Sequence, residues 1–521
     1  MTNDLTDTLP RWCRITFVIA ALAVLSIALR RDDLLTNKPL TEDGYYMLAV
    51  SRHLALGDGI SVDGVQPTNG VQPLFTFLAA PAYWLAGGDR LLALRWVLLL
   101  HGLCFVGAAW LFGLVLRDLG AARGVARAEA LRWIGSCAWL ASGYLFLMAH
   151  NGLETGCLLL LYLAYWRFAQ LHPLRGLPLA AAHGVWLGVI VLARIDATFF
   201  VTALCGLHLL RGEGPFAARL REAVVAGLVA VAVSSPWWIY NVAEFGALMP
   251  SSGAAQSGMV DPGDDVVMSR ITEGLRNLLL VATPILYAGD GAGGFGFVLV
   301  RIAFLAAIAG ILCWRRGAPV KGTLGATQGG AKSDQGRTVA AALLLTGAAF
   351  AVYYPVNFWA THFYSRYFIV LAPFGMAAFA IAALRVFHRP RRFDVLLPLA
   401  LLACTGGLAV IVHTGVGFAG NQWLRDQVSL VRENVPPGAR LAAGQSGTLG
   451  YFVDGVHNLD GKVNAAALRH QADMGVYLTE HRIEWLCDWP AYLHRYVDPR
   501  KLAAEWQLVA QRGEFELWRR R

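Results

Sequence analysis

The chain has 521 residues, of which 56% are hydrophobic and only 15% are charged, and its formal net charge is +9. An average soluble domain carries roughly 25% charged residues, so this composition excludes an ordinary soluble enzyme and indicates a polytopic membrane protein. Most basic residues lie in short loops between apolar runs, which is typical of residues that set membrane orientation. We therefore expect a lipid bilayer as partner and no nucleic acid.

Apolar runs predict the membrane-spanning helices, since such a helix needs about 20 apolar residues. We expect about eleven spans, at 12–30, 91–116, 133–150, 156–171, 179–194, 196–210, 223–241, 295–313, 339–355, 368–385 and 395–414. The segments 179–194 and 196–210 also fit one broken or tilted pair. The apolar stretches 73–86 and 278–288 are too short to cross, so we expect helices that lie along the interface.

Loop charge predicts the orientation. With the amino terminus in the cytoplasm, the cytoplasmic loops hold 20 Lys and Arg residues, and the opposite loops before the last span hold 9. The positive-inside rule favours this layout. It places the first loop, 31–90, and the polar carboxyl-terminal region outside the cell membrane, on the periplasmic side. The basic, Gly-rich segment 314–338 is expected to be a flexible cytoplasmic linker.

The carboxyl-terminal region has a different composition from the rest of the chain. RLAAG, IEWLCDW and FELWR alternate as strands do, whereas GTLGYFVDG resembles a helix followed by a turn. We therefore expect a membrane domain over 1–414 and a small periplasmic α/β domain over 415–521.

Two adjacent acids, Glu42 and Asp43, follow the first span in the stretch TEDGYYMLAVSRHLALGDGI. Thr41 or Asp43 could simply cap the helix that follows. Adjacent residues do not face each other on a helix, so the two acids are not a paired-carboxylate site. One of them can still point into a cavity while the other faces water.

Four other outward loops bring polar side chains to the same face. Each also has an ordinary structural explanation: Arg194 and Asp196 could form an ion pair at a helix break, Arg366 could anchor a helix end, and Tyr45, Tyr46, Trp237, Trp238 and Trp359 would suit an interfacial aromatic belt. The candidate substrate-binding residues are Gln72, Glu154, Arg194, Asp196, His362, Tyr364 and Arg366.

A carboxylate beside arginines at the outer interface suits group transfer from a lipid phosphate. An acceptor hydroxyl needs a base, and Arg is well shaped to bind a phosphate leaving group. A transporter or lipid flippase remains an alternative, although transport sites usually lie near the bilayer midplane in repeated halves, and we find no internal repeat. A transferase of a non-sugar group from a lipid phosphate would use the same face.

Several motifs resemble those of the GT-C class of integral-membrane glycosyltransferases, especially bacterial protein mannosyltransferases, aminoarabinose transferases and lipopolysaccharide-core transferases. These motifs are EDGYYMLA (42–49), PTNGVQPL (67–74), NGLET (151–155), ARIDA (193–197), YNVAEFGALMPSSGAAQS (240–257), SRYF (365–368) and NLDGKVN (458–464). The resemblance implies a hexosyl- or pentosyltransferase that uses a polyprenyl-phosphate sugar donor. The acceptor would be a glycan, a lipid or a protein.

The resemblance also implies roles for individual residues. Asp43 would activate the acceptor, with Glu42 as the weaker candidate, and Arg366 or Arg194 would lie near the donor phosphate. Glu154 and Asp196 would bind sugar or support the site. Relatives often carry a lysine where this chain has Gln256, which would move the phosphate-binding role to an arginine. A divalent metal ion is compatible with the acids of the first loop but is not required by them, and no Cys or His spacing predicts a metal site.

Overall fold

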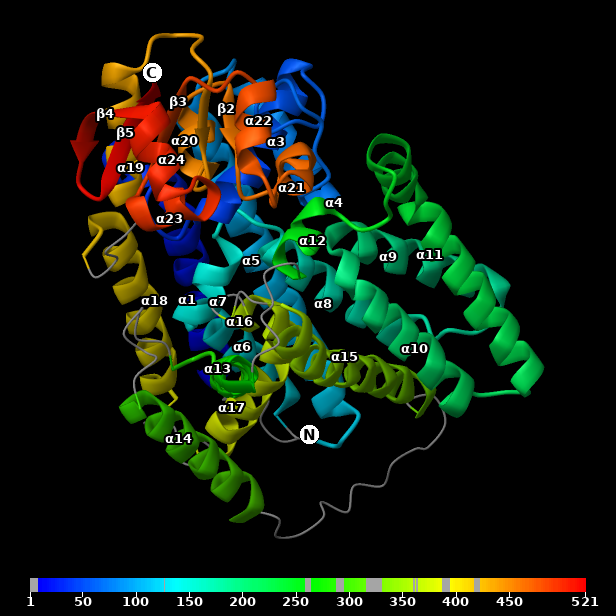
Figure 1. Cartoon of the computed structure of the whole chain (residues 1–521). Helices are drawn as coiled ribbons and strands as arrows, with labels where there is room; N and C mark the ends of the chain where they lie inside the picture. The colour runs from blue at the N-terminus through cyan, green and yellow to red at the C-terminus, as the bar shows by residue number, and fades with distance from the viewer. Residues whose placement is uncertain are drawn as a thin grey trace.

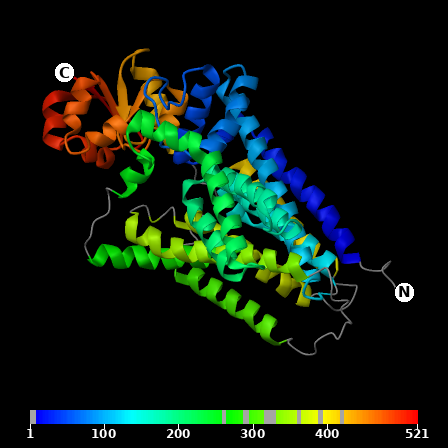
Figure 2. The ribbon, with the colours of Figure 1, turned by 90° about the vertical axis from the view of Figure 1, so that its right-hand side faces the viewer.

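A computed structural model describes residues 8–125, 127–257, 264–286, 295–314, 330–358, 361, 364–386, 394–416 and 422–521. The described chain forms a large helical bundle with a small α/β domain at one end (Figure 1). A view turned by 90° shows the same arrangement, with the α/β domain beside the first loop and away from the amino-terminal end of the first helix (Figure 2).

Every one of the eleven predicted spans coincides with helical structure. The helices of the bundle are α1 (Thr8–Leu25), η2 (Ser26–Leu29), α5 (Arg90–Ala121), α6 (Ala128–Ala141), α7 (Gly143–Ala149), α8 (Thr155–Leu171), α9 (Leu177–Ala193), η3 (Ile195–Ala197), α10 (Thr198–Arg211), α11 (Phe216–Phe245), α13 (Asp264–Ala282), α14 (Phe295–Trp314), α15 (Gly330–Asn357), α16 (Tyr364–Tyr367), η6 (Phe368–Leu371), α17 (Ala372–Val386) and α18 (Leu396–Thr414). Among the described residues, 7 helices are long and apolar enough to cross a membrane, which identifies a multi-pass membrane protein.

Three details of the bundle differ from the sequence-based expectation. The expected span 133–150 is divided between α6 and α7, because Ser142 leaves helical geometry and caps α7 with its hydroxyl. The second part of the expected linker 314–338 is helical, since α15 begins at Gly330, and residues 315–329 lie outside the described residues. Of the stretch 278–288, residues 278–282 form the end of the longer helix α13, residues 283–286 are not helical, and residues 287–288 are outside the description.

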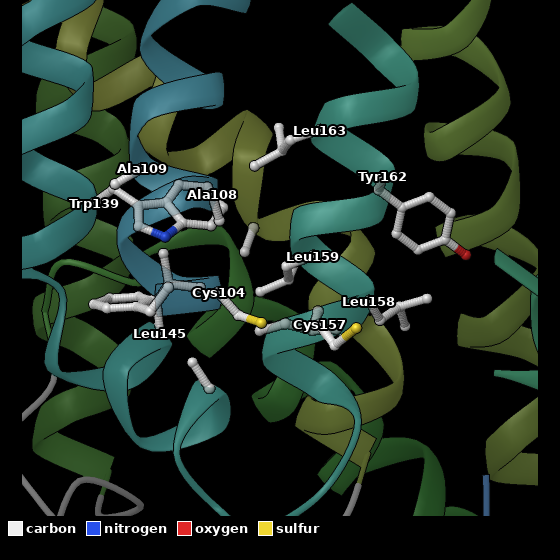
Figure 3. Close-up of a cluster of buried hydrophobic side chains, with 14 of the residues drawn as sticks. Cys104, Ala108, Ala109, Trp139, Leu145, Cys157, Leu158, Leu159, Tyr162 and Leu163 are labelled. Carbon is white, nitrogen blue, oxygen red and sulfur yellow. The ribbon is translucent and has the colours of Figure 1, made fainter. Parts of the chain in front are cut away.

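Close helix packing holds the bundle together. In α9, a Cβ atom on Gly184 would lie 2.6 Å from the Ala226 carbonyl oxygen of α11, and one on Gly188 would lie 2.8 Å from that of Ala230. Only glycine permits this approach, which is the usual device for helix packing in membranes. Elsewhere the core is filled by side chains of α5, α6, α7 and α8, as the cluster around Cys104, Trp139 and Leu159 shows (Figure 3).

The first loop contributes three helices outside these spans. They are α2 (Asp32–Leu35), α3 (Glu42–Leu56) and α4 (Pro73–Leu85). Helix α4 corresponds to the apolar stretch 73–86 that we expected to lie along the interface. It packs on α3 and α5. A short helix, α12 (Ser251–Ser257), follows α11.

The carboxyl-terminal α/β domain contains a five-stranded sheet in the order β2-β1-β3-β5-β4. Strand β1 pairs in parallel with β2 and β3, whereas β5 pairs antiparallel with β3 and β4. Its elements are α19 (Gln422–Asn434), β1 (Leu441–Ala443), α20 (Gly447–Phe452), β2 (Val456–Asn458), α21 (Ala465–Arg469), α22 (Met474–Glu480), β3 (Trp485–Asp488), α23 (Pro490–Tyr496), α24 (Pro499–Glu505), β4 (Trp506–Arg512) and β5 (Phe515–Arg520). Strands β1, β3 and β5 and helix α20 lie in the sequence stretches for which we expected them.

Side chains alternate across this sheet and are buried on both faces. Trp485 and Cys487 face one apolar cluster with Leu424 of α19, whereas Leu486 faces another with Tyr477 of α22. Helices therefore cover both faces, as parallel strands require. The domain packs on the rest of the chain mainly through contacts between α20 and α3, which belongs to the first loop.

Candidate active site

A cavity of about 460 Å³ lies where the first loop, the bundle and the α/β domain meet. Segments far apart in the sequence supply its walls: the start of α3, the loop before α4, the links α7–α8, α9–α10 and α11–α12, the end of α15, α16 and the turn before α21. Its lining includes five of the predicted site residues besides Asp43 and mixes carboxylates, cationic groups and aromatic rings. The lining residues that carry the argument are Asp43, Tyr46, Gln72, Glu154, Arg194, Asp196, Tyr354, Arg366, Tyr367 and Lys462.

Asp43 lies in the first turn of α3 and lines the cavity. It is not the cap of this helix, because the hydroxyl of Thr41 accepts the hydrogen bond from the Gly44 N–H at 3.3 Å. The Thr41 hydroxyl in turn donates to the carbonyl oxygen of Asn151 at 3.0 Å. The Asp43 carboxylate is thus available for another role at the cavity wall.

Gly44 allows α3 to approach the loop before α8 closely. A Cβ atom at Gly44 would lie 2.2 Å from the carbonyl oxygen of Asn151, which no side chain tolerates. The Thr41 N–H also donates to that oxygen at 3.1 Å. The glycine in the EDGYY motif therefore brings Asp43 to the same cavity as Glu154, which follows Asn151 in the chain.

Glu42 faces away from the cavity and contacts the α/β domain. Its carboxylate accepts hydrogen bonds from the N–H groups of Gly447 at 2.5 Å and Thr448 at 3.0 Å, at the start of α20. Burial raises the pKa of Glu42 above its ordinary value, although these donors oppose that shift. We expected the second acid to face water, but it instead anchors α20 on α3. Its suggested catalytic role stays a prediction that this geometry does not favour.

The structure brings Arg194, Asp196 and Glu154 together at the helix break between α9 and α10. The Arg194 guanidinium lies 2.9 Å from the Asp196 carboxylate and 3.8 Å from that of Glu154. It also donates to the Arg366 carbonyl oxygen at 3.1 Å. The structural ion pair considered from the sequence exists, and it forms part of the cavity wall.

Arg366 and the aromatic residues around it form the neighbouring wall. The rings of Tyr354 and Tyr367 stack with centroids 3.8 Å apart, and the Arg366 guanidinium lies 5.4 Å from the Tyr367 centroid. The Tyr354 hydroxyl donates to the Asp196 carboxylate. Gln72 lines the cavity too, and its side-chain oxygen accepts from the Ile195 N–H at 3.2 Å.

Besides Glu42, two predicted substrate-binding residues are not placed in the cavity wall. Tyr364 is buried at the start of α16, where its hydroxyl donates to the Phe358 carbonyl oxygen at 2.6 Å, and it does not belong to the lining. Its contact supports Phe358, which does line the cavity. His362 lies outside the described residues.

Two of the expected aromatic-belt residues have a different environment. Tyr45 and Tyr46 are buried between the bundle and the α/β domain. The Tyr46 hydroxyl donates to the Gly444 carbonyl oxygen at 3.2 Å and accepts from the Asn458 amide at 3.1 Å. The pair therefore docks the α/β domain on α3 rather than facing the lipid interface.

Lys462 is a cavity residue that sequence reasoning missed. It belongs to NLDGKVN, one of the motifs that resemble those of GT-C enzymes, but this lysine was assigned no role from the sequence. Its ammonium lies 3.4 Å from the Asp43 carboxylate and 3.7 Å from that of Asp460. Burial alone would lower the pKa of Lys462, but the carboxylates of Asp43 and Asp460 outweigh it and raise the pKa above its ordinary value.

The sequence shows Lys462, but only the three-dimensional contacts show that it lies beside Asp43. A single lysine in a turn is normally solvated, and no sequence pattern links residue 462 to residue 43. Within the described part of the chain, no three His, Cys, Asp or Glu side chains group as metal ligands would. A divalent ion as cofactor therefore remains an untested expectation.

The carboxyl-terminal region, but not the whole chain, matches a known sequence family. Residues 416–520 match a family described as a domain of unknown function (DUF8728). No curated protein matches the sequence.

Solved structures show a clearer likeness. ArnT from Cupriavidus metallidurans bound to undecaprenyl phosphate superposes with a TM-score of 0.58 at 15% identity, and 97% of each chain is covered. The apo state of the same protein gives a TM-score of 0.57 at 14% identity, again over 97% of each chain. An oligosaccharyltransferase from Archaeoglobus fulgidus, in complex with Zn and sulfate, gives 0.43 at 12% identity over 91% of this chain and 67% of that one. The chain thus has the fold of ArnT over nearly its whole length.

Proposed function

We propose that this protein is a membrane glycosyltransferase that moves a sugar from a polyprenyl-phosphate donor to an acceptor hydroxyl at the outer face of the bacterial cell membrane. One observation carries the proposal: Asp43 shares a cavity of about 460 Å³ with Arg194, Arg366 and Lys462. The ArnT-like fold supports it, because the superposed ArnT binds undecaprenyl phosphate.

In the proposed reaction the acceptor hydroxyl attacks the anomeric carbon of the donor sugar. Asp43 accepts the hydroxyl proton as the new C–O bond forms. The bond between the anomeric carbon and the phosphate oxygen breaks, and its electron pair leaves with the polyprenyl phosphate. Because negative charge grows on this leaving group, cationic donors fixed in the cavity stabilise the transition state more than the ground state.

The other lining groups suit recognition of a sugar phosphate. Arg194 and Arg366 present planar cationic groups that match phosphate oxygens. The rings of Tyr354 and Tyr367 offer flat faces beside them, and Gln72, Glu154 and Asp196 offer polar atoms for sugar hydroxyls.

The proposal is tested by the substitution Asp43→Asn in the full-length protein. General-base catalysis contributes about 10²- to 10⁴-fold to rate, so sugar transfer from a polyprenyl-phosphate donor should fall by that order. Membrane insertion and the melting temperature should stay close to those of the wild type, because the amide has the same shape. Full transfer activity in this variant would remove Asp43 from the mechanism.

A further inference from the structure

Lys462 reaches the cavity from the α/β domain, at the turn between β2 and α21. The turn is held by its own side chains: the Lys462 N–H donates to the Asp460 carboxylate at 2.8 Å, and the Gly461 N–H donates to the Asn458 side-chain oxygen at 3.0 Å. Gly461 has a φ of 78°, which favours glycine at this position. The backbone at residue 462 is therefore fixed within its domain.

The same turn is also fixed against the membrane domain. The carbonyl oxygen of Lys462 accepts from the Ser251 hydroxyl at 2.8 Å. A Cβ atom on Gly70 would lie 1.9 Å from that oxygen, so the first loop touches the turn directly. The Asn69 side chain joins these segments by accepting from the Ser251 N–H at 3.0 Å. Three distant segments thus meet at Lys462, whose side chain lines the cavity.

The cations of the cavity differ in how firmly they are held. Arg194 is bound by Asp196, by Glu154 and by the Arg366 carbonyl oxygen, and it lies 4.6 Å from the Tyr367 ring centroid. Lys462 instead ends in a compact ammonium on a flexible stem. Its nearest acidic partner facing the cavity is Asp43, the carboxylate that must accept the acceptor's proton in the proposed reaction.

An ion pair with Lys462 would make Asp43 a weaker base. A neighbouring cation stabilises the carboxylate and so weakens its basicity. A donor phosphate entering the cavity would offer the ammonium a second anion, and phosphate oxygens are strong acceptors from Lys. Moving the ammonium from Asp43 to the phosphate would strengthen the base and stabilise the leaving group together.

We propose that Lys462 of the α/β domain binds the phosphate of the polyprenyl donor and, before the donor arrives, holds Asp43 in an ion pair that donor binding releases. This inference rests on the proposed function and deepens it, because it makes the α/β domain part of the active site. Asp43 and the donor phosphate then compete for one ammonium. The competing explanation is that the pair only fixes the two domains together.

The test measures binding of undecaprenyl monophosphate to the purified full-length protein by microscale thermophoresis. Lys462→Met should weaken this binding by about tenfold, the loss expected for one charge-assisted contact, whereas Lys462→Arg should retain part of it. Lys501→Met, at an exposed lysine of α24 in the same domain, should bind like the wild type. Asp43→Asn should bind the lipid phosphate more tightly than the wild type, because the competing carboxylate is gone.

The double variant Asp43→Asn/Lys462→Met separates the competition from a purely structural pair. It should lose the gain in affinity shown by Asp43→Asn. Equal lipid-phosphate affinity in the wild type and Lys462→Met would overturn the inference. If Lys462→Met does not fold, the lipid-phosphate affinity of Asp43→Asn alone tests the inference. An affinity equal to that of the wild type would then overturn it. No binding of the lipid phosphate by the wild type would instead contradict the proposed function itself.

Discussion

Glu42 and Asp43 are neighbours in the chain, but their carboxylates have different surroundings. Successive residues of a helix point in different directions, so the first turn of α3 can present one acid to α20 and the next to the cavity. Glu42 accepts from two backbone N–H groups of α20 and from the Thr448 hydroxyl. Its contacts hold α20 on α3, whereas Asp43 is the carboxylate that lines the cavity.

The substitution Glu42→Gln tests this division of roles. The amide loses an acceptor oxygen, so at least one of its hydrogen bonds to α20 is lost. We expect destabilisation by about 1–3 kcal/mol, the usual cost of leaving a buried polar group unsatisfied. The folded fraction should keep most of its sugar-transfer activity. Thermal melting and activity per folded protein check this, and a variant that melts normally but is as inactive as Asp43→Asn would place Glu42 in the chemistry.

At the scale of elements, the position of Asp43 depends on the contact between α3 and the loop before α8. Gly44 makes this contact possible, because a Cβ there would overlap the Asn151 carbonyl oxygen. Since the start of α3 and the loop must separate to admit a methyl group, Asp43 and Glu154 would move apart. The glycine thus links backbone packing to the geometry of the cavity.

We predict that Gly44→Ala lowers stability by about 1–3 kcal/mol, as overpacking of a tight contact does. It should also reduce sugar transfer, because Asp43 is displaced. Gly227→Ala is a matched control, since Gly227 lies within α11 and nothing would contact a Cβ there. That control should be neutral or slightly stabilising. Unchanged melting and activity in Gly44→Ala would show that α3 can shift without disturbing the site.

Elements with a strong local signal were predictable from the sequence. Long apolar runs predicted the helices at all eleven expected spans. The alternation in IEWLCDW and FELWR predicted β3 and β5. The break between α6 and α7 was missed because Ser142 lies inside an apolar run, and only its capping contact reveals the change. Strand β2 has 3 residues and lies beside turn residues, too short for a periodic pattern.

The candidate site was predictable where polar residues lie near the ends of apolar runs. Asp43, Glu154, Arg194 and Asp196 satisfy this condition, and all line one cavity. Lys462 was not predicted, and Tyr46 was assigned to the aromatic belt, because their contacts join segments about 400 residues apart. The hydrogen bond from Lys462 to Asp43, for example, spans a separation of 419 residues. Such pairings depend on how the α/β domain docks, which no local pattern contains.

At the scale of the whole molecule, the α/β domain and the bundle pack together around the cavity. The buried hydroxyl of Tyr46 joins α3 to the turn after β1, and Lys462 closes the cavity from the same side. In both views of the molecule, the α/β domain lies at the first-loop end of the bundle (Figures 1 and 2). The cavity, the first loop and this domain must therefore all lie on the same side of the membrane.

Loop charge predicts the side of the membrane on which the α/β domain lies. Labelling of single introduced cysteines can measure it. The positive-inside rule predicts that the basic loop 117–132 is cytoplasmic and that the α/β domain is outside. Ala122→Cys and Lys501→Cys both place a thiol at an exposed position. In intact cells a membrane-impermeant maleimide should label Lys501→Cys at once and Ala122→Cys only after permeabilisation. The wild type, whose own cysteines remain, gives the background. The reverse pattern would place Asp43 on the cytoplasmic side and would contradict transfer at the outer face.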